Sequence, residues 1–179
     1  MRRRRRNKIP HFNLKTGSGI AALLIFVVFQ LIAAYQESAA HEMLTGAAHI
    51  SDGDSITIAG QRIRLLGIDA PEMKQQCYRD SKPYACGKEA KHALEQFVAG
   101  RVVSCNIESQ DRYQRHIAEC YAGELNLNAQ MVASGHALAY RHYSTRYVSQ
   151  EESARAQRFG MHGARYTEPW EWRKSSRRK

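Results

Sequence analysis

The stretch RVVSCNIESQDRYQRHIAECY, residues 101–121, decides the fold. Two segments rich in strand-forming residues flank a polar stretch, which predicts a β-hairpin. If the turn is centred between Arg112 and Tyr113, Cys105 lies opposite Cys120. The Cα atoms of a non-hydrogen-bonded antiparallel pair lie about 4.5 Å apart, which is within disulfide range. We therefore predict a hairpin closed by a Cys105–Cys120 disulfide.

Short strands precede this hairpin, and helices lie on both sides of it in the sequence. Apolar spacing and capping residues predict helices over residues 87–99, 126–134 and 147–159, with Asn126 as the N-cap of the second. The other predicted elements are a strand-like stretch over 50–58 with a turn at Asp52-Gly53-Asp54, a hairpin turn at Ala59-Gly60-Gln61, a return strand over 62–66, a polar loop over 74–84 and a short apolar segment over 136–140.

This order of elements favours a small barrel. The chain has 179 residues, of which 43% are hydrophobic and 25% charged, which excludes a disordered, collagen-like or multi-span membrane chain. Five short strands with a helix after the third fit a partly open barrel of the OB type. We predict an α+β fold, a five-stranded OB-type β-barrel with about three helices, preceded by an N-terminal hydrophobic helix. Periodicity alone supports only the α+β class.

The two ends of the chain carry its net charge of +10. Of 27 basic residues, seven lie in residues 1–40 and five in 173–179, so residues 41–172 hold 15 basic and 16 acidic residues. The folded part is nearly neutral, and total charge gives no argument for nucleic-acid binding. The basic tail, 173–179, is expected to be solvated and to have no catalytic role.

The first 40 residues carry an export or anchoring pattern. Five consecutive arginines in a polybasic cytoplasmic region, 1–19, precede an apolar run over residues 20–35, and small residues follow at 38–40. A cleaved signal peptide and a short uncleaved inner-membrane anchor both fit residues 20–40. Both place the folded domain, 41–172, outside the cytoplasm, as a periplasmic, secreted or membrane-tethered protein.

All four cysteines follow the apolar run. An even number in an oxidising compartment predicts two disulfides. Of the three connectivities we favour Cys77–Cys86, which closes a short polar loop, together with Cys105–Cys120. A four-cysteine zinc site is the alternative, but the sequence contains no C-x-x-C pair.

Three short clusters combine carboxylates with guanidinium groups. They are DGDS at residues 52–55, RLLGIDAPE at 64–72 and DRYQR at 111–115. Each alone fits an ordinary turn or strand end. Together they supply what phosphodiester hydrolysis needs, namely hard oxygen ligands for Ca²⁺, an ionised carboxylate that handles water, and arginines that bind phosphate.

These clusters, with GKEAKHAL at 87–94 and NLNAQMVASGHALAY at 126–140, resemble the staphylococcal nuclease family over about residues 47–160. The resemblance implies an OB barrel and Ca²⁺-dependent cleavage of DNA and RNA, preferably single-stranded or frayed. Its products would carry a 5′-hydroxyl and a 3′-phosphate. Monomer is the default expectation, and residues 20–35 would contact the membrane if uncleaved.

The resemblance also implies a calcium site. Asp54 and Asp69 would be its carboxylate ligands, and the backbone carbonyl of Ala70 would be a further ligand. Asp52 is expected to support the turn or to lie behind the ligands.

The same resemblance implies the groups that act on the phosphodiester. Glu72 would position or deprotonate the attacking water, while Arg64 and Arg115 would bind the scissile phosphate. Tyr113 would hydrogen-bond a phosphate or stack on the nucleotide. Gln114 departs from the family, which usually has glycine there, so the backbone of that turn decides where Arg115 points.

Two other readings compete with an active nuclease. One is a catalytically inactive member that binds nucleic acid or protein, and the other is a Ca²⁺-stabilised envelope module. Inactive members of the family lose the carboxylates or the arginines, and this chain keeps them, which favours the nuclease. The near-neutral domain favours the envelope module.

Overall fold

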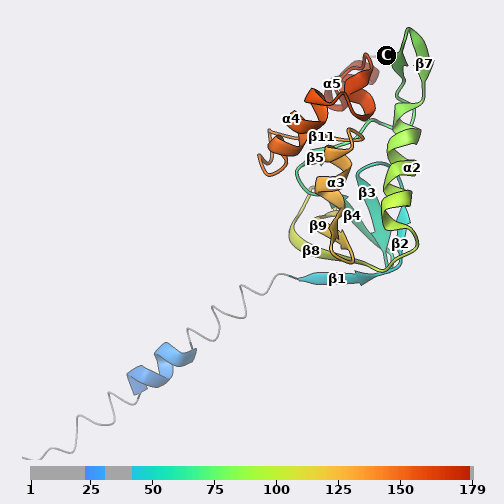
Figure 1. Ribbon diagram of the computed structural model, residues 1–179. Helices are drawn as coiled ribbons and strands as arrows, with labels where there is room; N and C mark the ends of the chain where they lie inside the picture. Colours follow the sequence, from blue (N-terminus) through green and yellow to red (C-terminus); the bar gives the residue numbers. More distant parts are fainter. Residues whose placement is uncertain (1–22, 31–41, 178–179) are drawn as a thin grey trace, which may run out of the picture. The chain divides into compact units, whose positions relative to one another are not determined.

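The computed structural model describes residues 23–30 and 42–177 (Figure 1). The chain divides into two units, Met1–Ala40 and His41–Lys179. Residues 23–30 are helical, while the predicted polybasic region and the rest of the predicted signal or anchor lie outside the described residues. Within the described part of the chain, no helix is long and apolar enough to cross a membrane.

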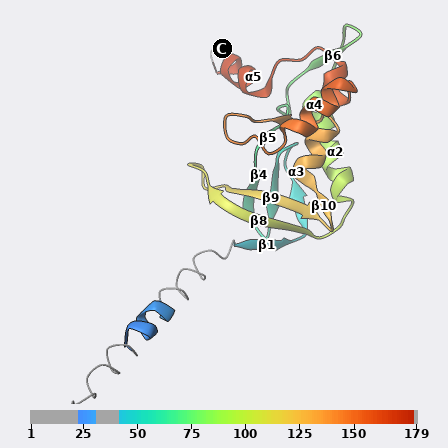
Figure 2. The ribbon, with the colours of Figure 1, turned by 60° about the vertical axis from the view of Figure 1, so that its left-hand side comes forward.

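A seven-stranded sheet curls into a nearly closed barrel (Figures 1 and 2). Its strands are β1 (Met43–Gly46), β2 (Ala48–Ile50), β3 (Ser55–Ile58), β4 (Gln61–Leu65), β8 (Val103–Gln110), β9 (His116–Ala122) and β10 (Leu125–Asn126). Only Ala47 separates β1 from β2, so this first stretch pairs with β8 at one end of the sheet and with β3 at the other. The α+β barrel of the OB type is confirmed. The sheet has seven strands where five were predicted. The interruption at Ala47 divides the first strand into β1 and β2, and the two-residue strand β10 was not predicted.

The central hairpin has the predicted register. Cys105 of β8 lies opposite Cys120 of β9, with Cα atoms 4.1 Å apart and a disulfide between them. Both cysteines are fully buried in the barrel core. A bulge between Ile107 and Ser109 shifts the pairing toward the tip of the hairpin.

Helices cover the barrel at the positions expected from apolar spacing. They are α2 (Cys86–Val98), α3 (Leu127–Ala133) and α4 (Val148–Ala156). Ala90, Leu94 and Val98 place one face of α2 in the core. The Asn126 side chain accepts a hydrogen bond from the Ala129 N–H at 2.9 Å, so it caps α3 as predicted.

Two small strand pairs differ from the sequence prediction. Residues expected to form a polar loop include a hairpin of β6 (Cys77–Arg79) and β7 (Lys82–Tyr84), closed by the Cys77–Cys86 disulfide. A second small pair joins β5 (Ile68–Asp69) to β11 (Leu138–Ala139). The sequence pattern did not predict these pairs, because strands of two or three residues are too short to show an alternation of apolar and polar residues.

The C-terminal segment also differs from the prediction. A 3₁₀ turn (Gly160–Gly163) follows α4, and a last helix, α5 (Pro169–Ser176), follows that turn. The predicted boundary between domain and tail, at residue 172, therefore falls inside α5.

Candidate active site

Two buried carboxylates lie on either side of one guanidinium group. Nη1 of Arg64 donates to Oδ1 of Asp54 at 2.8 Å, and Nη2 donates to Oδ1 of Asp69 at 2.6 Å. Asp54 exposes 4% of its surface and Asp69 none. The structure thus brings together three residues to which the sequence assigned metal or phosphate binding.

Strand pairing and a close backbone approach fix this geometry. The residue after Asp54 pairs with Arg64 across β3 and β4, so the two side chains start from neighbouring positions. A Cβ on Gly53 would lie 2.7 Å from the Cβ atoms of Ala70 and Ala90, so the turn before β3 accepts only glycine. The N–H of Ala70 donates to Oδ2 of Asp54 at 3.0 Å, which fixes the Asp54 carboxylate at the end of β5.

Burial and the charge of Asp54 disfavour ionisation of two neighbouring acids, Asp69 and Asp52. Burial raises the pKa of Asp69, and the charge of Asp54 adds to this effect, although hydrogen bonds from Arg173 oppose it. Burial and the charge of Asp54 raise the pKa of Asp52 to about 6. Oδ1 of Asp52 accepts from the Asp54 N–H at 3.0 Å, so Asp52 supports the turn as expected.

A short loop carries Glu72 to the rim of the site. A Cβ on Gly87 would overlap the carbonyl oxygen of Glu72, so the start of α2 packs directly on this backbone. Buried Gln75 accepts from the Glu72 N–H at 3.2 Å, and its own N–H donates to the Glu72 carbonyl at 2.7 Å. The Cys77–Cys86 disulfide ties the same loop to α2. These contacts hold the backbone of Glu72 in place.

Arg115 is held by its own hairpin. Nε and Nη2 of Arg115 contact Oδ2 of Asp111 at 2.9 and 2.8 Å, and the Arg115 N–H donates to Oδ1 at 3.0 Å. Burial acts to raise the pKa of Asp111, but the hydrogen bonds from Arg115 outweigh it and lower that pKa. Arg115 is therefore paired with Asp111 rather than with Asp54 or Asp69.

The hairpin turn keeps a backbone suited to glycine although Gln114 occupies it. Gln114 has a φ of 60°, in the left-handed region, and its N–H donates to the Asp111 carbonyl at 2.9 Å. Tyr113, half exposed, precedes it, and its hydroxyl accepts from Nη2 of Arg112 at 2.9 Å. Gln114 thus adopts the left-handed backbone conformation that glycine adopts most readily.

Sequence reasoning missed one residue of the site, Arg173 on α5. Nη1 of Arg173 donates to Oε1 of Glu72 at 2.9 Å and to Oδ1 of Asp69 at 3.0 Å, while Nη2 donates to Oδ2 of Asp69 at 2.8 Å. The expectation that residues 173–179 are solvated is wrong for Arg173, which is paired with Asp69 and Glu72. The sequence signal was Pro169, because proline is favoured at the first position of a helix.

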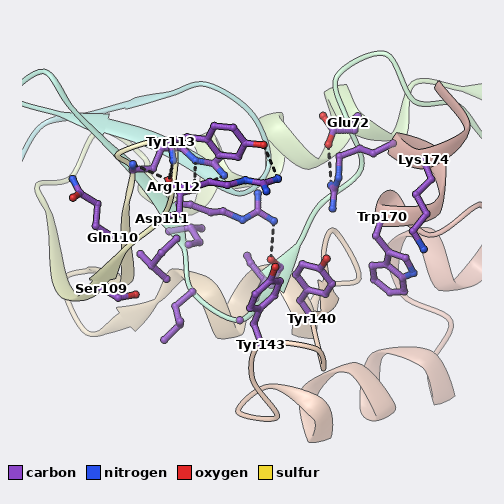
Figure 3. Close-up of a pocket in the computed structure, with 18 of the residues that line it drawn as sticks. Glu72, Ser109, Gln110, Asp111, Arg112, Tyr113, Tyr140, Tyr143, Trp170 and Lys174 are labelled. Carbon is purple, nitrogen blue, oxygen red and sulfur yellow. Dashed lines mark hydrogen bonds and ion pairs between the residues drawn. The ribbon is translucent and has the colours of Figure 1, made fainter. Parts of the chain in front are cut away.

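These groups border one cleft of about 790 Å³. Asp111, Arg112 and Tyr113 lie on one side of it, and Glu72, Trp170 and Lys174 lie on the other (Figure 3). Tyr140 and Tyr143 lie between the two sides (Figure 3). Of the predicted site residues, Arg64, Glu72, Tyr113 and Arg115 line the cleft. Asp54, Asp69 and Ala70 are buried behind it.

The donor set suits a hard cation in part. Asp54 and Asp69 are neighbouring oxygen donors whose repulsion a cation would relieve. Among the residues that the structure describes, no group of three or more acidic, histidine or cysteine side chains could hold a metal. A calcium ion here would need backbone carbonyl and water ligands, which Ca²⁺ accepts readily. It would also need Arg173 to release the oxygens of Asp69.

The cleft combines guanidinium groups, which bind phosphate, with carboxylates, which can activate water. This combination on a small barrel indicates a phosphodiester hydrolase. Residues 62–163 match the family described as "Staphylococcal nuclease homologue". The chain belongs to the staphylococcal nuclease family.

Curated relatives include two proteins named as nucleases and one named for polysaccharide biosynthesis. A protein named "Succinoglycan biosynthesis protein ExoI" from Rhizobium meliloti is 34% identical over 134 residues, which cover 73% of this chain and 69% of that protein. An "Uncharacterized endonuclease" from Haemophilus influenzae is 34% identical over 136 residues, covering 72% and 71%. "Probable staphylococcal-like nuclease CAN4" from Oryza sativa subsp. japonica is 33% identical over 129 residues, covering 70% of this chain. The match spans only 24% of that longer protein.

Proposed function

We propose that this chain is a Ca²⁺-dependent endonuclease that acts outside the cytoplasm. It would hydrolyse DNA and RNA to products with a 5′-hydroxyl and a 3′-phosphate. The observation that carries the proposal is the bridge from Arg64 to Asp54 and Asp69, beside a cleft that Glu72 and Arg115 also line. Relatives named as nucleases and endonucleases support the same reading.

Asp54, Asp69 and the Ala70 carbonyl are the proposed calcium ligands. Bound Ca²⁺ would polarise a phosphoryl oxygen and neutralise its charge without redox chemistry. Each of these residues lies directly behind the wall that Arg64 presents to the cleft. Arg64 can therefore hold a phosphate next to the carboxylates.

The remaining residues carry out the displacement. Glu72 accepts a proton from water on a carboxylate oxygen, and the water oxygen forms a bond to phosphorus. The bond from phosphorus to the 5′-oxygen breaks, and that oxygen takes a proton from solvent to become the 5′-hydroxyl. Arg64 and Arg115 bind the equatorial oxygens as their charge grows, and Tyr113 contacts the nucleotide.

The disulfides of the fold support an extracytoplasmic location. Both predicted disulfides are present, and together they use all four cysteines. Disulfides persist in oxidising compartments and are rare in the cytosol. Whether export ends in cleavage of the signal or in a membrane anchor is decided by the mature N-terminus of the purified protein.

The test is a digestion assay on single-stranded DNA, duplex DNA and RNA, in Ca²⁺ and in EDTA, with Arg115→Ala run alongside. Cleavage that needs both Ca²⁺ and Arg115 would support the proposal. A folded protein that binds Ca²⁺ and nucleic acid but does not cleave would instead favour a catalytically inactive binding module.

A further inference from the structure

One wall of the cleft lies outside the segment that defines the family. The family match ends at residue 163, and α5 begins at Pro169. Trp170, Arg173 and Lys174 of α5, with Arg177 directly after it, line the cleft. Half of the cleft's basic residues therefore come from a segment that the family match does not include.

Positive charge gathers in this cleft although the domain is nearly neutral. Six basic residues and two acidic residues line it. Three of the six bases are Arg173, Lys174 and Arg177, and the others are on the barrel and its hairpin. A cleft of one predominant sign concentrates a ligand of the opposite sign.

The position of α5 is fixed by contacts to the barrel. Arg173 pairs with Asp69 and Glu72. The ring of Trp170 stacks on Tyr140, with centroids 5.5 Å apart and planes at 4°. Nε2 of Gln75, in the loop behind Glu72, donates to the carbonyl of Thr167 at 2.6 Å. The helix is thus a built part of the cleft.

The wall pairs an aromatic ring with basic side chains. Trp170 lies one helical turn from Lys174, and Arg177 follows about one turn later. Lys174 contacts Glu171 at 2.7 Å, but both side chains are exposed, so this pair is weak and a phosphate can replace it. Basic side chains beside stacking rings are the means by which proteins bind single strands, whose bases are free to stack.

We propose that α5 forms the second wall of a site for single-stranded nucleic acid. Trp170 stacks on a base, and Lys174 and Arg177 bind backbone phosphates that flank the scissile one. This inference rests on the proposed nuclease function. In this proposal, α5 binds the part of the nucleic-acid strand that extends beyond the cleaved bond.

The test measures binding without cleavage. A labelled oligothymidylate is titrated with the full chain in EDTA, and fluorescence anisotropy is recorded at several salt concentrations. The variants are K174A/R177A, and K82A/K88A as a control that removes the same charge at two exposed lysines away from the cleft. Because all variants keep the same N-terminal arginines, differences between them report only the substituted sites.

K174A/R177A is expected to weaken binding by about 10-fold and to reduce the slope of log K against log salt by about 1.4, the value for two single-strand phosphate contacts. The control is expected to change binding by less than about 2-fold. Glu171→Gln, which frees Lys174, is expected to tighten binding. If K174A/R177A behaves like the control while the wild type binds and cleaves, the α5 proposal fails alone. If the wild type does not bind in EDTA but still cleaves in Ca²⁺, the α5 proposal fails alone. If it neither binds nor cleaves, the proposed function fails with it.

Tryptophan emission supplies an independent measurement. The chain has two tryptophans, Trp170 and Trp172, and both lie on α5. In W172F, emission from Trp170 alone is expected to fall as the strand binds, with the same midpoint as the anisotropy. Binding without any change in this emission would place the strand away from α5 and overturn the proposal.

Discussion

The two walls of the cleft are held in place by different kinds of interaction. The hairpin wall continues β8 and β9, so the backbone ladder and the Cys105–Cys120 disulfide support it. The α5 wall depends on side chains, chiefly the ion pairs of Arg173 and the stacking of Trp170 on Tyr140. The hairpin can therefore move only if the barrel is disturbed. The α5 wall shares its supports with the site and can respond to what the site binds.

The largest effect is expected at Glu72, which lies on the same side of the cleft as α5 and pairs with Arg173. Glu72→Gln should lower kcat by at least about 100-fold, because the amide cannot accept the proton of the attacking water. The amide oxygen can still accept the hydrogen bond from Arg173, so melting temperature should stay close to that of the wild type. Steady-state kinetics and thermal melting measure the two quantities.

Glu124→Gln is the matched control for this change. It makes the same substitution at an exposed position after β9, outside the cleft. Its kcat should equal that of the wild type. Near-normal cleavage by folded Glu72→Gln would remove Glu72 from the chemistry.

The second-largest effect is expected on stability, when the disulfide that supports the hairpin wall is removed. C105A/C120A should lower the free energy of unfolding by about 3 kcal/mol, because the disulfide closes a loop with a sequence separation of 15. Denaturant titration under oxidising conditions measures this loss. A loss below about 1 kcal/mol would mean that the barrel ladder alone holds the hairpin.

C77A/C86A sharpens this comparison because its disulfide lies in the loop that carries Glu72. Its sequence separation of 9 gives a similar loss, about 2.6 kcal/mol. Only this variant should also lower kcat, since it loosens Glu72. Equal kcat in the two variants would show that Gln75 and Gly87 hold Glu72 without the disulfide.

The hairpin wall could be predicted from the sequence, and the α5 wall could not. The hairpin is local, since two strands around one turn fix the register that pairs Cys105 with Cys120. The helix predicted over 87–99 could be found in the same way, because its apolar stripe faces the core. In the structure, α2 covers Cys86–Val98. In both cases residues close in sequence make the contacts that define the element, and the pattern is long enough to be read. The shorter hairpin of β6 and β7 is also local, but its three-residue strands carry too little pattern.

Arg173 shows why the α5 wall was not predicted from the sequence. It contacts Asp69 across 104 residues of sequence and Glu72 across 101. No periodicity encodes such a contact, and α5 has no apolar stripe that would set it apart from a basic tail. The sequence resemblance that identified the carboxylates and Arg115 ended at about residue 160, before α5 begins. Long-range ion pairs outside a family's core are visible only in three dimensions.

The third effect tests the response of the α5 wall to a cation. Arg173→Ala should tighten Ca²⁺ binding by about 10-fold, or about 1.4 kcal/mol. It removes a guanidinium that occupies both oxygens of Asp69. Calorimetric titration with CaCl₂ measures the affinity. Arg177→Ala removes the same charge one turn away and should change it little. Unchanged or weaker Ca²⁺ binding in Arg173→Ala would argue against Asp69 as a calcium ligand.

The smallest effect is expected at the tip of the hairpin wall. Gln114 holds a left-handed φ of 60°, which costs a residue with a side chain about 1–2 kcal/mol. Glycine avoids this strain but loses more conformational freedom on folding, by about 0.5–1 kcal/mol. Gln114→Gly should therefore stabilise the protein by roughly 0.5–1 kcal/mol and raise its melting temperature by a few degrees.

Gln110→Gly is the control for this change. It makes the same substitution in the extended strand β8 and should lower the melting temperature. A fall in melting temperature for Gln114→Gly would mean that contacts of the glutamine side chain outweigh the backbone strain. The tip would then owe its shape to Gln114 as well as to Asp111.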